Sequence, residues 1–197
     1  VDQKTIYTFA PVAAPFTVTN TGGTGLAGSQ KTITVLAANM PKLFVRGPGN
    51  LVAGVCTHYQ IETYTPTNTV YKVRINTPVN LTGSLSSAKF FSDAQCTGTL
   101  ANNTTIIAAF ASVQTVYVTV TQADQNLMVE ASSGGYTTSN VTNPVLANIP
   151  KQIVFSGVPS SLPAGRCSNA IQVSLKDQYG NTAKAATALN LALSYMG

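Results

Sequence analysis

The sequence predicts an all-β protein that folds as a series of antiparallel β-sandwich units. Charged residues make up only 9% of its 197 residues, far below the roughly 25% of an average globular chain. Thr, Ser, Asn and Gln supply the polarity instead, which suits the exposed faces of sheets. Apolar and polar residues alternate along much of the chain, and a period of two favours half-buried strands over helices. The sequence also repeats itself at long range.

The alternating segments mark the strands in chain order. Their β-branched and aromatic residues suit a pleated surface that is buried on one face. Segments with glycine, at residues 21–23, 47–50, 133–135 and 179–181, separate them as turns. The predicted strands cover residues 5–9, 16–20, 31–36, 43–46, 59–65, 71–75, 88–92, 112–121, 127–132, 153–156, 170–176 and 189–194.

The repeat has a period of about 110 residues. Leu-Val-Ala-Gly-Val-Cys-Thr at residues 51–57 matches Leu-Pro-Ala-Gly-Arg-Cys-Ser at residues 162–168. Ala-Asn-Met-Pro-Lys at residues 38–42 matches Ala-Asn-Ile-Pro-Lys at residues 147–151. Because separate landmarks agree on one spacing, we interpret them as a structural repeat.

The chain is out of phase with this repeat. Residues 1–40 correspond to the last strands of one unit, residues 41–149 to one complete unit, and residues 150–197 to the first strands of a further unit. A unit of about 110 residues with about seven short strands is typical of an immunoglobulin-like sandwich. We therefore expect immunoglobulin-like antiparallel β-sandwich repeats, one complete and two partial.

Several motifs resemble those of bacterial immunoglobulin-like tandem repeats of the invasin-like type. They are Ala-Gly-x-Cys at residues 53–56 and 164–167, Asp-Gln-Tyr-Gly-Asn at 177–181, and Phe-Phe-Ser-Asp-x-x-Cys at 90–96. The resemblance implies a module of large surface proteins or adhesin stalks, and it bears on function only by analogy. The complete unit departs from the pattern, because Thr-Pro-Thr-Asn-Thr stands at residues 65–69 where the Asp-Gln-Tyr-Gly-Asn turn is expected. We expect that turn to be rebuilt.

The three cysteines divide into a pair and a single thiol. Cys56 and Cys96 lie in the same unit, and we expect a disulfide between them, with two free buried thiols as the alternative. A disulfide that closes such a loop contributes on the order of 3–4 kcal/mol in the chain-entropy model. Cys167 matches Cys56 in the repeat, but its unit holds no second cysteine, so it is either unpaired or bonded to another chain. A disulfide implies an oxidising, extracellular or periplasmic setting.

The two partial units are expected to need partners. A partial sandwich exposes an apolar face and unpaired strand edges. We expect the first strands of one copy, residues 150–197, to pair with the last strands of another, residues 1–40. Such a head-to-tail contact does not close, so it builds filaments. The alternatives are a segment of a longer tandem array, and pairing of both ends within one chain.

The sequence shows no constellation for catalysis. It has a single histidine, His58, and six acidic residues without a cluster, too few for a triad or a calcium loop. We therefore expect no enzyme, no metal site and no cofactor. The net charge of +5 reflects few acids rather than a run of Lys or Arg, which argues against nucleic acid as a partner. No apolar run approaches the roughly 20 residues of a membrane-spanning helix.

Two functions remain. The first is a structural subunit of an extracellular bacterial filament or adhesin stalk at the cell surface, whose partner is another copy of itself. The alternative is an adhesin module that binds a surface glycan or receptor. Tyrosine rings stack well on sugars, and the candidate contacts are Tyr59, Tyr64, Tyr136 and Tyr179.

Overall fold

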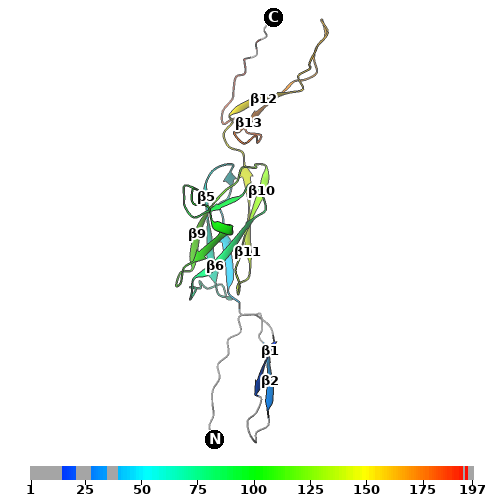
Figure 1. Ribbon diagram of the computed structural model, residues 1–197. Helices are drawn as coiled ribbons and strands as arrows, with labels where there is room; N and C mark the ends of the chain where they lie inside the picture. The colour runs from blue at the N-terminus through cyan, green and yellow to red at the C-terminus, as the bar shows by residue number, and fades with distance from the viewer. Residues whose placement is uncertain (1–14, 21–27, 35–39, 193, 195–197) are drawn as a thin grey trace.

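The structure, a computed structural model, describes residues 15–20, 28–34, 40–192 and 194, and its centre is a β-sandwich (Figure 1). One sheet has the strand order β4-β11-β10-β6-β8, formed by Leu51–Val52, Ser139–Leu146, Gln125–Ser132, Thr77–Gly83 and Thr104–Ile107. The other has the order β3-β5-β9-β7, formed by Lys42–Arg46, Thr57–Tyr64, Val113–Thr119 and Lys89–Phe91. These strands pair antiparallel, apart from the short parallel pairing of β4 with β11. The predicted all-β sandwich class is confirmed.

The core lies between the two sheets because each strand presents alternate side chains to it. On β5, Tyr59 and Ile61 are buried, whereas Gln60 lies on the outer face and is exposed. Burial of one large aliphatic or aromatic side chain stabilises a fold by about 1.5–3 kcal/mol. The core contains Leu43, Val45, Leu51, Tyr59, Ile61, Val73, Val79, Leu81, Phe90, Ile107, Val116, Val118, Val120, Leu127, Val129, Ala131 and Val145.

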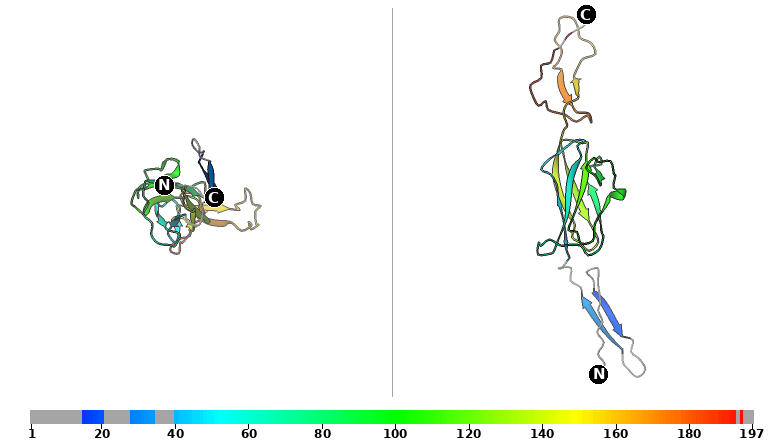
Figure 2. Two further views of the ribbon diagram at one scale, coloured as in Figure 1. Left: turned by 90° about the horizontal axis from the view of Figure 1, so that it is seen from below. Right: turned by 90° about the vertical axis from the view of Figure 1, so that its left-hand side faces the viewer.

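Two further antiparallel hairpins lie beyond opposite ends of the sandwich (Figures 1 and 2). The first consists of β1 (Pro15–Asn20) and β2 (Ser29–Thr34), and the second of β12 (Gln152–Ser156) and β13 (Gln172–Lys176). Within the sandwich, a short 3₁₀ turn, η2 (Ala101–Asn103), leads into β8.

The structure confirms most of the predicted strands to within two residues at each end. Residues 71–75 form no strand, nor do the described residues of the segment 189–194. The predicted strand at residues 5–9 lies outside the described residues. The prediction also missed β4, β6, β8 and β11.

Proline explains two of the missed strands, since its ring removes a backbone donor and breaks the expected pattern. Pro78 in β6 pairs with Ile106 of β8 but lies outside the pairing with β10. Pro144 in β11 pairs with β10 and comes just before the pairing with β4. Each proline therefore stands where its strand has a neighbour on one side only.

Among the described residues, no helix is long and apolar enough to cross a membrane. The strands of the sandwich lie between Lys42 and Leu146. The division of the chain into units 1–40, 41–149 and 150–197 stays a prediction.

Candidate functional site

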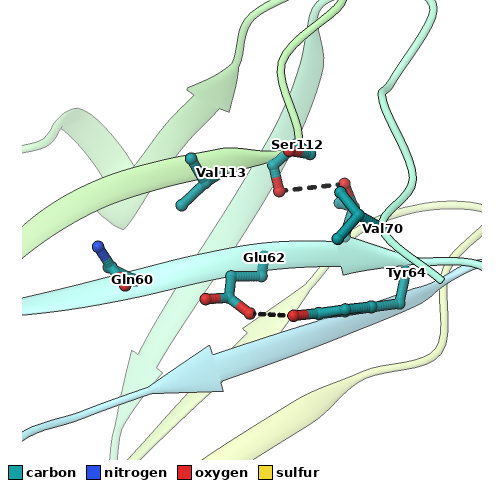
Figure 3. Close-up of a pocket in the computed structure, with 7 residues that line it drawn as sticks. Gln60, Glu62, Tyr64, Val70, Ser112 and Val113 are labelled. Atoms are coloured by element: carbon teal, nitrogen blue, oxygen red, sulfur yellow. Dashed lines mark hydrogen bonds between the residues drawn. The ribbon is translucent and has the colours of Figure 1, made fainter. Parts of the chain in front are cut away.

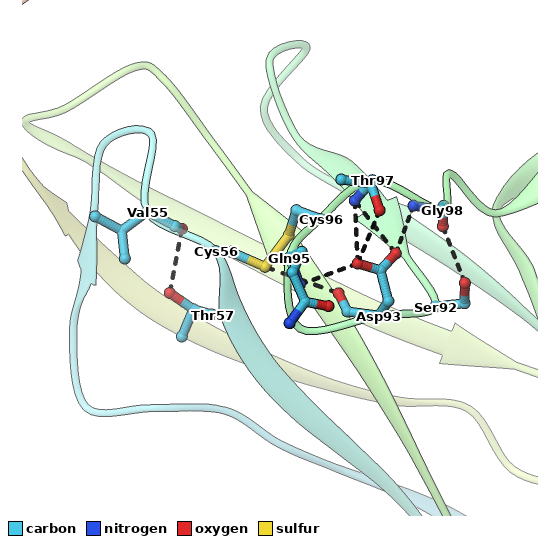
Figure 4. The surroundings of a disulfide bond; sticks show 9 residues. All are labelled: Val55, Cys56, Thr57, Ser92, Asp93, Gln95, Cys96, Thr97 and Gly98. Atoms are coloured by element: carbon cyan, nitrogen blue, oxygen red, sulfur yellow. Dashed lines mark hydrogen bonds between the residues drawn. A yellow bond between two sulfur atoms is a disulfide. The ribbon is translucent and has the colours of Figure 1, made fainter.

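The disulfide between Cys56 and Cys96 is present, with Cα atoms 5.8 Å apart (Figure 4). It ties the residue before β5 to the loop after β7, and these two strands flank β9 in one sheet. Cys167 is exposed and free. The cross-link therefore joins two segments of one sheet that do not pair with each other.

The loop that carries Cys96 is held by Asp93 (Figure 4). The Asp93 carboxylate accepts hydrogen bonds from the backbone N–H of Gln95 at 3.0 Å, of Thr97 at 3.2 Å and of Gly98. These bonds, that from Gly98 foremost, stabilise the charged form and lower the pKa of Asp93. Asp93 is thus a turn residue that closes the loop on which the disulfide is placed.

A shallow groove of about 270 Å³ lies on the outer face of the β3-β5-β9-β7 sheet (Figure 3). It is lined by Gln60, Glu62, Thr63, Tyr64, Val70, Ser112 and Val113. Glu62 lies between two donors, accepting a 2.9 Å hydrogen bond from Arg46 Nε and a 2.6 Å bond from the Tyr64 hydroxyl. Beside the groove, the Phe44 ring meets Tyr64 edge-on at 6.2 Å, and Arg46 lies over Phe44 at 4.9 Å.

The four candidate tyrosines do not gather at one place. Tyr64 lines the groove. Tyr136 is partly buried against the core, 6.4 Å from the ring of Tyr71. Tyr179 belongs to the turn after β13. These three tyrosines thus lie on different elements, and whether any of them contacts a ligand stays a prediction.

Tyr59 corrects the expectation of an exposed ligand contact. Its side chain is completely buried, and its hydroxyl donates a 2.9 Å hydrogen bond to Asn143 Oδ1. Burial raises the pKa of this hydroxyl. The alternation of β5 places residue 59 on the same face as Ile61, so it faces the core rather than the solvent.

The second hairpin contacts the sandwich through a turn at residues 177–181, which sequence reasoning had treated only as a turn. Asp177 is completely buried. Its carboxylate accepts hydrogen bonds from the backbone N–H of Tyr179 and of Asn181, both 2.9 Å, and from the Asn181 side chain at 2.9 Å. It also accepts a 3.0 Å bond from the N–H of Asn148, in the segment that follows β11. Burial acts to raise the pKa of Asp177, but these donors outweigh it and lower the pKa.

Two side chains of this region bind the end of the sandwich directly. Asn181 accepts a 3.0 Å hydrogen bond from the N–H of Ala123 and donates a 2.8 Å bond to the carbonyl of Thr121. Asn148 donates a 2.8 Å bond to the carbonyl of Ala53. Tyr179 lies against Gly54, where an added Cβ would overlap the phenol ring. The turn and the end of the sandwich thus form a polar, hydrogen-bonded joint.

The equivalent turn of the sandwich, residues 65–69, corrects the expectation that it is rebuilt. The N–H of Thr65 bonds to the carbonyl of Thr69 at 2.7 Å, as Asp177 bonds to Asn181 at 3.0 Å. Asn68 has a φ of 63°, and Gly180, at the matching position, a φ of 83°. The backbone turn is therefore retained, and only its side chains differ.

Among the described residues, no other cluster of side chains suggests chemistry. His58 is exposed on β5, where it pairs with Tyr117. Within the described parts of the chain, no three His, Cys, Asp or Glu side chains come close enough to hold a metal ion. The groove, the joint and the exposed apolar side chains of β12–β13 are the features of the described residues on which a function can be argued.

No protein-family model matches the sequence, and no curated protein sequence matches it. Among solved structures, the chain is similar to domains 4 and 5 of the S-layer protein SbsC, with 16% identity and a TM-score of 0.36 over 59% of this chain and 58% of that one. It is also similar to domains 4–9 of SbsC, with 16% identity and a TM-score of 0.39 over 84% and 26% of the two chains. A conjugative transposon lipoprotein from Bacteroides eggerthii shows 12% identity and a TM-score of 0.34 over 51% and 92%.

The chain spans less than two thirds of either SbsC structure. All three TM-scores are below 0.5, and nothing about the function of this chain is inferred from them. The resemblance to bacterial immunoglobulin-like repeats stays a hypothesis.

Removing the disulfide should destabilise the sandwich. The separation of 40 residues between Cys56 and Cys96 predicts a loss on the order of 3–4 kcal/mol for the Cys56→Ala/Cys96→Ala variant, because the unfolded chain regains loop entropy. Urea unfolding of the sandwich measures the change. Cys167→Ala is the control and should leave the urea midpoint unchanged. Equal urea midpoints for the parent, the double variant and the control would contradict the prediction.

Acid should release the joint only below the ordinary aspartate pKa of 3.8. Because folding lowers the pKa of Asp177, its contribution to stability is complete above the unfolded value and is lost as the pH falls through the lower folded value. Amide chemical shifts of Asn148, Tyr179 and Asn181, followed by NMR while the pH is lowered from neutral, should therefore move together below pH 3.8. A common midpoint above that value would show that Asp177 lacks these donors in solution.

Proposed function

We propose that the chain is a structural subunit of an extracellular bacterial filament or adhesin stalk at the cell surface, assembled head-to-tail by exchange of strands between partial sandwiches. The proposal is non-enzymatic. One observation carries it. The hairpin β12–β13 has the same strand register as the β3–β5 hairpin of the sandwich, but its side chains that correspond to core residues are exposed.

The two hairpins share one register. Lys42 of β3 pairs with Tyr64 of β5, and Gln152 of β12 pairs with Lys176 of β13 at the matching end. In both hairpins a turn follows directly after this pair, at residues 65–69 in the first hairpin and at residues 177–181 in the second. β12 and β13 are therefore the counterparts of β3 and β5.

Their inward faces differ in exposure. Leu43 and Val45 of β3 are 2% and 3% exposed, because the opposite sheet covers them. Their counterparts Ile153 and Phe155 are each 49% exposed, and Val173 on the facing strand is 40% exposed. Within the described part of the chain, the apolar face of this hairpin therefore has no second sheet of the kind that covers its counterpart.

The hairpin β1–β2 is the natural source of that second sheet. In the sandwich, β10 and β11 pair with each other and lie against β3 from the opposite sheet. The sequence repeat matches residues 16–23, which include most of β1, with residues 127–134 at β10. The hairpin β1–β2 of one copy can therefore cover β12–β13 of another, which supports a head-to-tail assembly.

The purified 197-residue chain should polymerise, and removal of residues 1–38 should leave monomers. Sedimentation velocity measures the size, and negative-stain microscopy shows whether the polymers are filaments. Phe155→Lys tests the contact without a deletion, because a charge on the covered face opposes burial. Met128→Lys, at an exposed apolar position on β10, is its control and should still polymerise. An intact chain that stays monomeric at all concentrations would overturn the proposal.

A second candidate function, binding of a cell-surface glycan, rests on the groove. Tyr64 and the nearby Phe44 offer aromatic surface, and Gln60 and Ser112 offer polar groups at the same place. Sugars combine apolar ring faces with hydroxyl groups, and such a mixture of aromatic and polar side chains can accommodate both.

If the groove binds a glycan, Tyr64→Ala in the full chain should weaken that binding by about tenfold, or 1.4 kcal/mol. The loss would follow from the missing ring and from the Glu62 carboxylate losing one of its donors. A glycan array identifies the ligand, and titration calorimetry measures its affinity. Met128→Ala, on the opposite sheet, should bind as the parent does. If no glycan binds the parent chain, this second function is excluded.

A further inference from the structure

We propose that the end face of the sandwich around Gly54 is a docking surface for a turn of the type Asp-x-Tyr-Gly-Asn, and that this turn holds the unit that carries it in a fixed orientation on the unit before it. The surface consists of Ala53, Gly54, Thr121, Ala123 and Asn148. Its partner is the turn at residues 177–181, and the proposal does not depend on whether the chain forms filaments.

The contact is a set of matched donors and acceptors rather than an apolar patch. The Asn181 amide bonds to two backbone groups of the sandwich, the N–H of Ala123 and the carbonyl of Thr121. The segment between the units bonds in both directions, since Asn148 donates its N–H to Asp177 and its side-chain amide to Ala53. Because buried polar groups must keep their partners, such a set favours one orientation of the hairpin over all others.

Two features of the structure require glycine at position 54, its backbone conformation and its contact with Tyr179. Its φ of +75° is a left-handed conformation that side chains disfavour. A Cβ at this position would also occupy the space that the Tyr179 ring fills. The glycine recurs in the third unit as Gly165, which has the same φ of +75°. Gly54 therefore leaves room for the Tyr179 ring, which lies against it and stays 40% exposed.

The turn at residues 65–69 of the sandwich shows that the backbone turn closes without the side chains that the joint uses. Its own turn at residues 65–69 closes by the same backbone bonds, and Thr65 Oγ1 accepts from the N–H of Thr69 at 3.1 Å as Asp177 accepts from Asn181. Threonine thus replaces Asp177, Tyr179 and Asn181 at the three matching positions. These threonines complete the turn but carry neither the ring nor the amide that the joint uses.

This difference supplies the decisive variant, Asp177→Thr/Tyr179→Thr/Asn181→Thr. The substituted turn takes its side chains from a turn that closes in the same protein, so it should still form. It should no longer dock. The matched control is Thr67→Ala/Thr69→Ala, which truncates side chains of the equivalent turn without touching the joint.

Distances between spin labels measure the orientation directly. With Cys167 replaced by Ser, labels are placed on cysteines substituted for Asn126 of β10 and Gln172 of β13, both exposed. Dilution with unlabelled chain isolates the distances within one molecule, so the measurement works for monomers and filaments alike. Sedimentation of the same samples reports assembly separately, and circular dichroism verifies that the sandwich remains folded.

We expect one narrow distance distribution for the parent protein and the control, and a broad one for the triple-threonine variant. The amide of Ala123 should at the same time lose its protection from hydrogen exchange, while that of Met128, which donates to Ser84, should keep it. A triple variant that retains the narrow distribution would overturn the proposal. A parent protein with a broad distribution would do so as well.

Discussion

Burial of one apolar face per sheet is the constraint on which the rest of this structure depends. In the sandwich the two faces cover each other, and Leu43, Val45 and Ile61 are almost completely withdrawn from water. The hairpin β12–β13 has the same register but no covering sheet among the described residues. Ile153, Phe155 and Val173 are each about half exposed, so covering them would recover about half of the usual 1.5–3 kcal/mol per side chain, or roughly 2–5 kcal/mol. That gain approaches the lower end of the stability of a whole domain, about 5 kcal/mol.

The way the second hairpin meets the sandwich follows from the same constraint. The apolar face of each sheet lies inside the sandwich, so the contact between the second hairpin and the sandwich is made largely by backbone groups and amides at the strand ends. Asp177 is the one ionised side chain of this joint, and it is surrounded by four N–H donors. Since the remaining partners are neutral, the joint should depend little on ionic strength. In a chain with only 9% charged residues, the contact between the second hairpin and the sandwich is thus made by hydrogen bonds rather than by ion pairs.

Local patterns in the sequence were sufficient for the fold class, most strands and the disulfide, because these depend on alternation and on spacing within one unit. The alternation of β5 also indicated that Tyr59 faces the core, since Tyr59 and Ile61 lie on one face of the strand and His58, Gln60 and Glu62 lie on the other. Prolines concealed β6 and β11, because their effect depends on which neighbour each strand has at that position. The joint could not be foreseen, since nothing in the sequence shows that Asn148 and Asp177 meet. The sequence held its parts, namely the Ala-Gly-x-Cys motif, the Asp-Gln-Tyr-Gly-Asn motif and the repeated Ala-Asn pair, but not the contacts between them.

The two turns that follow β5 and β13 show how one backbone turn can be kept while its side-chain contacts change. Both need an acceptor at the first position and a left-handed residue at the fourth, and Thr65 with Asn68 meets these needs as Asp177 with Gly180 does. The backbone bonds that close the turn do not run through the side chains at the third and fifth positions, although Thr67 and Asn181 each bond to the side chain of the first residue of their turn. In the turn after β5 these two positions hold threonines, and in the turn after β13 they hold the ring and the amide that contact the sandwich. In our proposal, the orientation of the second hairpin on the sandwich therefore depends on Tyr179 and Asn181 together with Asp177, which also closes its own turn.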